Sequence, residues 1–140
     1  MQKLKKGIIK ALNTILASTD TTKLDSEVRV KLVRNFITTR IIANDLNLLE
    51  EDTVKKIVTE EYRTLQAKEN KNEEETKLFN TLTEQVNKEY IDILNPVLNE
   101  EIEVDIKEIS EDEFDKLVSG ISNLNLSQFD LLHELLIKKD

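Results

Sequence analysis

The sequence predicts an all-α, mainly helical protein: a helical hairpin or bundle with one short extended strand near residues 101–107. Apolar residues recur at three- and four-residue steps through most of the chain, as they do on one side of a helix. Its 140 residues include only two Gly and one Pro, too few for the many turns of a β-sandwich or barrel. Strict alternation of apolar and charged residues, typical of a strand, occurs from Glu101 to Lys107.

The first predicted helix spans about residues 3–18, and the polar residues 18–22 end it. Its apolar residues share one side at helical spacing: Leu4, Ile8, Leu12 and Ile15. A second helix is expected to begin near Asp25 or Ser26, either of which can cap exposed amide groups, and to end or bend at 44–47. Its apolar residues cover more than one side, which is typical of a helix that is central or lies at an interface.

Residues 50–95 predict an antiparallel helical hairpin. The third helix is expected over about 50–68, because the acidic residues at its start suit the positive end of the helix dipole. The fourth is expected over about 75–94, with Pro96 ending it. Both helices carry a narrow apolar stripe, and the short polar link between them favours antiparallel packing.

The C-terminal part, residues 97–140, predicts an acidic strand and two short helices. Ser110 and Glu113 have the spacing of a capping box for the first helix, and Ser127 is expected to cap the last. A lone strand leaves backbone groups unpaired. The segment 101–107 must therefore pair with another chain, pair with an undetected strand, or lie extended on the bundle. We expect pairing with a partner or across a symmetry axis.

The whole chain, 1–140, is expected to form a single helical domain, with basic helices in residues 1–48. The first 49 residues carry nine Lys and Arg against four Asp and Glu, whereas the rest carry 11 against 24. Such asymmetry is typical of a nucleic-acid surface with a competing acidic tail. We favour the alternative, in which the basic helices pack near the acidic segment or are solvated. No aromatic residues interleave with the basic ones, and a net charge of −8 opposes tight phosphate binding.

Residue types that carry chemistry are scarce. The absence of Cys excludes disulfides, thiolate metal sites and cysteine nucleophiles. Asp130 and His133 share a helix side, but a metal would need further ligands, so we expect a surface or packing role for His133. Paired carboxylates such as Glu60 and Glu61 lie in polar stretches and are expected to be solvated. We expect no catalytic residue, metal or cofactor, and no enzyme activity.

Two segments, "LNEEIEVDIKEIS" and "LNLSQFDLLHELLI", follow the predicted hairpin. With this order of hairpin, first segment and second segment, residues 55–137 resemble small uncharacterised proteins of tailed bacteriophages with low-GC hosts. That resemblance implies an accessory or structural role in the phage particle or its assembly, and no known enzyme activity. The segments "SEVRVKLVRNFI", "EEDTVKKIVTEEYRTL" and "YIDILNPVLNEEI" are similar in order to helical tRNA-amidotransferase-like domain proteins, which implies a tRNA role.

The expected location is the host cytoplasm or the virion. No apolar run approaches the roughly 20 residues of a membrane span. The N-terminus has a basic start, but Lys10 and Asn13 interrupt its apolar part, so it reads as an amphipathic helix and not as a signal peptide. We therefore expect neither membrane binding nor secretion through a signal peptide.

Two functions remain as hypotheses. The first is docking to a protein partner or to a second copy, through the wide apolar surface of the second helix and the strand. Its candidate interface residues are Val30, Val33, Phe36, Ile37, Ile41, Ile102, Val104 and Ile106. The second is nucleic-acid or tRNA binding by the N-terminal basic helices. Its candidate basic patch is Lys3, Lys5, Lys6, Lys10, Arg29, Lys31, Arg34 and Arg40.

Overall fold

The computed structural model describes residues 1–137 and confirms a mainly helical fold. In chain order the elements are β1 (Gln2–Lys5), α1 (Lys6–Ala17), α2 (Ser26–Ile57), α3 (Glu60–Ala67), α4 (Glu73–Leu98), β2 (Glu101–Val104), α5 (Glu111–Ser119) and α6 (Leu126–Leu136). The chain divides into two compact units. Unit 1 combines Met1–Asn44 with the chain from Glu100 onward, and unit 2 is Asp45–Asn99. The long helix α2 therefore contributes its first part to unit 1 and its last part to unit 2.

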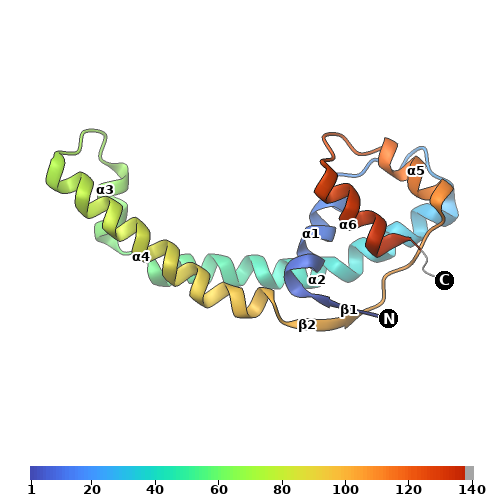
Figure 1. Cartoon of the computed structure of the whole chain (residues 1–140), viewed down its shortest axis with the longest axis horizontal. Helices are drawn as coiled ribbons and strands as arrows, with labels where there is room; N and C mark the ends of the chain where they lie inside the picture. Colours follow the sequence, from blue (N-terminus) through green and yellow to red (C-terminus); the bar gives the residue numbers. More distant parts are fainter. Residues whose placement is uncertain (138–140) are drawn as a thin grey trace. The chain divides into compact units, whose positions relative to one another are not determined.

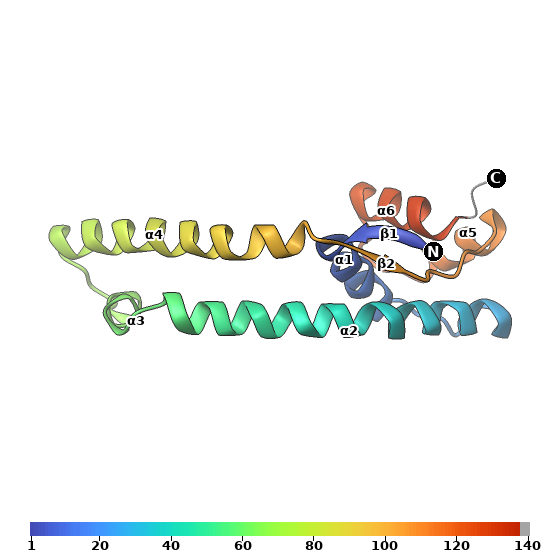
Figure 2. The ribbon, with the colours of Figure 1, turned by 90° about the horizontal axis from the view of Figure 1, so that it is seen from below.

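Unit 1 contains a two-stranded antiparallel sheet, in which β1 lies beside β2 (Figure 2). Gln2 lies opposite Val104, and Lys5 lies opposite Glu101. The expectation that the strand pairs with a partner or across a symmetry axis is wrong, because its partner strand comes from the same chain. The first helix consequently begins later than predicted, at Lys6, since the residues before it pair with β2. The strand itself is shorter than predicted and ends at Val104.

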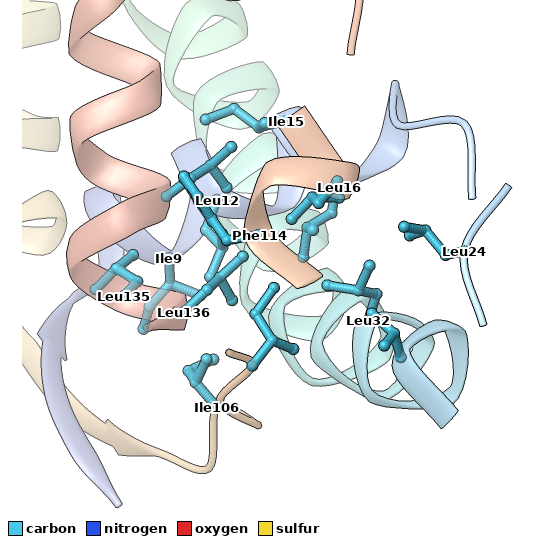
Figure 3. Close-up of a cluster of buried hydrophobic side chains, with 14 of the residues drawn as sticks. Ile9, Leu12, Ile15, Leu16, Leu24, Leu32, Ile106, Phe114, Leu135 and Leu136 are labelled. Atoms are coloured by element: carbon cyan, nitrogen blue, oxygen red, sulfur yellow. The ribbon is translucent and has the colours of Figure 1, made fainter. Parts of the chain in front are cut away.

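The core of unit 1 is built by α1, α5, α6 and the first part of α2 (Figure 1). Phe114 of α5 is 1% exposed and lies among side chains from several helices, including Leu12 and Leu136 (Figure 3). Its ring meets the edge of the Phe129 ring of α6, with centroids 5.3 Å apart. Fully burying a side chain of this size is worth about 1.5–3 kcal/mol. This cluster of large apolar residues is therefore what holds the short helices together.

The helix starts in unit 1 follow local sequence. The predicted capping box of α5 is confirmed: the N–H of Glu113 donates to the Ser110 hydroxyl at 3.2 Å, and the N–H of Ser110 donates to the Glu113 carboxylate at 2.8 Å. The prediction that Ser127 caps α6 is wrong, because the N-cap residue is Asn125. Asn125 exchanges two hydrogen bonds with Gln128, at 2.8 and 3.1 Å. Two reciprocal bonds satisfy two exposed donors, whereas a single serine cap satisfies one.

Unit 2 contains the last part of α2 together with α3 and α4. The sequence predicts that the second helix ends or bends at 44–47, and the first alternative is wrong, because α2 continues to Ile57. Leu46 is 3% exposed while its polar neighbours in that segment are exposed, so they continue the outer side of the helix without interrupting it. The helix predicted over 50–68 is divided as a result. Thr59 caps the short helix α3, whose start lies inside that range.

The helices α3 and α4 lie side by side, as the predicted hairpin requires (Figure 1). The rings of Tyr62 and Phe79 are stacked, with centroids 5.3 Å apart. The prediction that Pro96 ends the fourth helix is wrong, because α4 passes through it to Leu98. Proline removes one N–H from a helix. The carbonyl left without that donor belongs to Asp92, which is exposed and accessible to water.

Candidate functional site

The first part of α2 has a buried side and an exposed side. Its buried positions are Val28, Leu32, Asn35, Thr39 and Ala43. The exposed side carries a row of apolar residues, which we call the α2 stripe: Val30, Val33, Ile37 and Ile41. These side chains are 52%, 50%, 45% and 61% exposed, respectively. Steps of three and four residues place all four on one side of the helix.

Two buried polar side chains fix which side of α2 faces outward. The side-chain amide of Asn35 donates to the carbonyl of Lys107 at 3.0 Å and accepts from its N–H at 2.7 Å. The Thr39 hydroxyl donates to the carbonyl of Asn35 at 2.9 Å, and the Asn13 amide donates to that hydroxyl at 3.1 Å. A buried polar group left unpaired costs about 1–3 kcal/mol. Rotating α2 to bury the stripe would break the bonds between Asn35 and Lys107 and the bond from Asn13 to Thr39, so the stripe stays exposed.

Three adjoining depressions border the α2 stripe, with volumes of about 190, 490 and 290 Å³. The first, between the end of α1 and α2, shares Thr21 and Val33 with the second as lining residues. The second shares Arg34 with the third. Ile37 lines the third depression. Three of the four stripe residues, Val30, Val33 and Ile37, therefore line shallow depressions.

The rim of the stripe is positively charged. Arg29 and Arg34 line the second depression. The guanidinium carbon of Arg40 lies 5.7 Å from the centroid of the Phe36 ring, a cation–π distance. From Val28 to Asn44 the chain has four basic residues and no acidic one. This is the opposite of the whole chain, whose net charge is −8.

One carboxylate, that of Asp105, lines the third depression. The ammonium of Lys107 donates to it at 2.7 Å. This hydrogen bond, together with the positive charge of the same lysine, lowers the pKa of Asp105. The carboxylate is ionised and already matched by Lys107, so the arginines set the sign of the charge along the stripe.

The structure separates the residues predicted as a partner interface. Those of the α2 stripe are exposed, whereas Phe36 is half-buried and packs against the core. Val104 and Ile106 are each 6% exposed and belong to the core, and Ile102 packs against it. The strand part of the predicted interface is therefore corrected to core. Alternation reveals that one side of a strand is buried, but the same pattern arises against a partner or against the chain's own helices.

The predicted basic patch is divided among different elements. The Lys3 ammonium lies 3.9 Å from the Glu101 carboxylate, and that of Lys6 lies 3.2 Å from Glu100. For these two lysines, the interpretation that basic residues pack near the acidic segment is confirmed. The other members lie on β1 (Lys5), on α1 (Lys10) and on α2 (Arg29, Lys31, Arg34 and Arg40).

The single histidine connects α5 to α6. The Nε2 atom of His133 lies 3.1 Å from the Glu111 carboxylate, and its ring centroid lies 5.2 Å from that of Phe114. Within residues 1–137, no group of three or more His, Asp or Glu side chains is placed to hold a metal ion. Over the same residues, no helix has the length and apolar character of a membrane span.

The depressions and the role of the buried polar pair, Asn35 and Thr39, could not be predicted from the sequence. Asn35 and Thr39 stand four residues apart, between apolar positions of the second helix. Polar residues at that spacing on a core-facing side indicate a specific hydrogen-bond partner, which the sequence alone does not identify. Comparison of the chain with protein-family models, with curated proteins and with solved structures finds no match.

Proposed function

We propose that this chain is a non-enzymatic protein–protein interaction protein that docks through the α2 stripe. Its role is accessory or structural, in a larger phage-encoded assembly, as the resemblance of residues 55–137 implies. One observation carries the docking role: four apolar side chains, each about half exposed, form one row on a helix whose other side is fixed in the core. Contiguous apolar surface rimmed by polar residues marks protein interaction sites.

The energetics of covering the stripe support this proposal. Fully burying one Val or Ile side chain is worth about 1.5–3 kcal/mol. Covering the exposed halves of all four therefore contributes roughly 3–6 kcal/mol before the cost of association, so micromolar binding also needs contacts around the stripe. The hydrogen bonds of Asn35 keep the chain from burying the stripe on itself.

Site-specific photocrosslinking of the full chain, in the cells that produce it, tests the docking role. A benzophenone amino acid replaces Ile41 in one variant and Leu126 in the control. Leu126 is 88% exposed, belongs to α6 of the same unit and lies outside the stripe. We expect a discrete crosslinked protein product at position 41 that is absent at position 126. No product at position 41, or the same products at both positions, would contradict the proposal.

A second candidate is a nucleic-acid- or tRNA-associated module. The observation that favours it is the run of four basic and no acidic residues from Val28 to Asn44. Binding through phosphates would retard tRNA in a gel at low salt and weaken steeply as salt is added. No retardation at low salt excludes this candidate. The ion pairs of Lys3 and Lys6 reduce the number of basic residues that could take part.

A further inference from the structure

We propose that the occupant of the α2 stripe is an amphipathic α-helix with acidic flanking residues, presented by another protein. This inference rests on the proposed docking role, because it specifies the chemistry of the partner that docks there. Three features support it: the helical spacing of the stripe, the positive charges beside it, and the repulsion that these charges would cause if a second copy of the chain docked there.

The spacing of the stripe fits a helix. From Val30 to Ile41 the stripe follows α2 for about three turns, roughly 16 Å. Rows of side chains at three- and four-residue steps receive the matching rows of a second helix. The depressions beside Val33 and Ile37 provide room for large apolar side chains of that helix. A partner helix of three to four turns with one apolar side would cover the whole stripe, a common mode of helix recognition.

The charges beside the stripe select an acidic partner. At 100° per residue, Arg34 lies on one flank of the stripe, and Arg29 and Arg40 lie on the other. Guanidinium groups bind carboxylates through two parallel hydrogen bonds, which fixes orientation as well as sign. The apolar contacts provide most of the affinity. The arginines provide partner choice and faster association, since exposed ion pairs are each worth only about 0–1 kcal/mol.

The same charges disfavour a second copy of the chain. Pairing about a two-fold axis places the same surface on both subunits. It would bring the flanking residues Arg29, Arg34 and Arg40 close to their own copies. Like charges across an interface oppose binding. Nucleic acid is also a poorer fit, because single-stranded bases stack on exposed aromatic rings, and the only aromatic residue of this segment, Phe36, packs against the core.

Designed peptides test the inference against the full-length chain by fluorescence anisotropy. The acidic peptide has about 16 residues, roughly four turns, with Leu along one side and Glu on both flanks. The matched basic peptide carries Lys in place of each Glu. We expect the acidic peptide to bind at least about tenfold more tightly, and its advantage to shrink in about 0.3 M salt. Equal binding, or preference for the basic peptide, would overturn the inference.

Variants of the stripe and of its charged flank, with competition by other occupants, complete the test. Arg34→Glu is expected to reduce or reverse the preference between the peptides, whereas Ile37→Asp is expected to weaken both. Leu126→Asp, outside the stripe, is the control and is expected to change neither. Circular dichroism checks that each variant is folded. Displacement of the acidic peptide by tRNA, or a sedimenting dimer that excludes the peptide, would overturn the inference. A crosslinked partner at Ile41 without an acidic helix would contradict this inference while leaving the docking role supported.

Discussion

The side-chain amide of Asn35 forms hydrogen bonds with both backbone polar groups of Lys107, at 3.0 and 2.7 Å. The two residues are 72 positions apart in the sequence, and Asn35 is fully buried. The amide therefore takes the place of a neighbouring strand. It pairs with the backbone N–H and carbonyl of Lys107, just after β2 ends, and so attaches this segment to α2. Because α2 is held in this rotation, the α2 stripe faces solvent.

Replacing Asn35 with Ala is expected to destabilise unit 1 strongly. The variant leaves the N–H and the carbonyl of Lys107 without their protein partners in a half-buried environment, at up to about 1–3 kcal/mol for each unpaired group. We expect a total loss of roughly 2–4 kcal/mol in the free energy of unfolding, measured by urea denaturation. Asn44→Ala, an exposed asparagine on the same helix, is the control and is expected to stay within about 0.5 kcal/mol. Equal effects of the two substitutions would show that the pairing with Lys107 does not stabilise the fold.

Substitutions on the two sides of α2 are expected to separate stability from binding. Leu32 is 3% exposed, so Leu32→Ala should cost about 2–5 kcal/mol of unfolding free energy through lost burial and a cavity. Ile37 is 45% exposed, so Ile37→Ala should cost far less, since part of its side chain is already in water. Thermal and urea unfolding of both variants measure the difference. A cost for Ile37→Ala as large as that for Leu32→Ala would mean that the stripe is core.

Gly120 allows a close backbone approach that a larger residue would disturb. A Cβ atom added there would lie 2.5 Å from the carbonyl oxygen of Asp20, whose N–H donates to the Gly120 carbonyl at 3.1 Å. Because a backbone atom cannot move aside as a flexible side chain can, Gly120→Ala is expected to cost about 1–3 kcal/mol. Ser122→Ala, at a nearby exposed position, is the control. A stability unchanged in Gly120→Ala would show that the loop adjusts freely.

The capping box of α5 is expected to make stability depend on pH. The N–H of Ser110 donates to the Glu113 carboxylate and lowers its pKa, against the opposing effect of desolvation. A carboxylate with a lower pKa in the folded state contributes stability above its unfolded pKa, about 4.3 for Glu, and loses it as the pH falls through the folded pKa. Glu113→Gln should therefore be less stable than the wild type at neutral pH, and the difference should shrink as the pH falls below about 4. Asp112→Asn, exposed in the same turn, is the control. A difference that is constant from neutral to acid pH would contradict this role of the carboxylate.

Short-range patterns in the sequence were enough for much of the fold. The all-α class and the Ser110–Glu113 capping box depend on neighbours within a turn or two of helix, and the structure confirms them. Of the predicted hairpin, α3 and α4 do pack side by side, but the predicted bounds are wrong, because α2 continues to Ile57 and α4 passes through Pro96. The apolar row on the second helix was also visible. Apolar residues cover much of the circumference of this helix because they lie on two sides of it: Leu32 is buried on one side, and Ile37 is exposed on the other.

Tertiary structure decided everything that depends on distant partners. Residues 2–5 have the pattern of a helix start, yet they form β1, because β2 offers unpaired backbone groups that only folding brings alongside. The fate of Val104 and Ile106 was open for the same reason: alternation indicates one buried side, whereas burial by the chain's own helices and burial by a partner look identical in sequence. Local hydrogen bonds and apolar periodicity depend on residues that are close in the sequence, so the sequence alone predicts them. The burial of a given apolar side depends on contacts between distant segments, such as those of Asn35 and Lys107, and these form only in the folded chain.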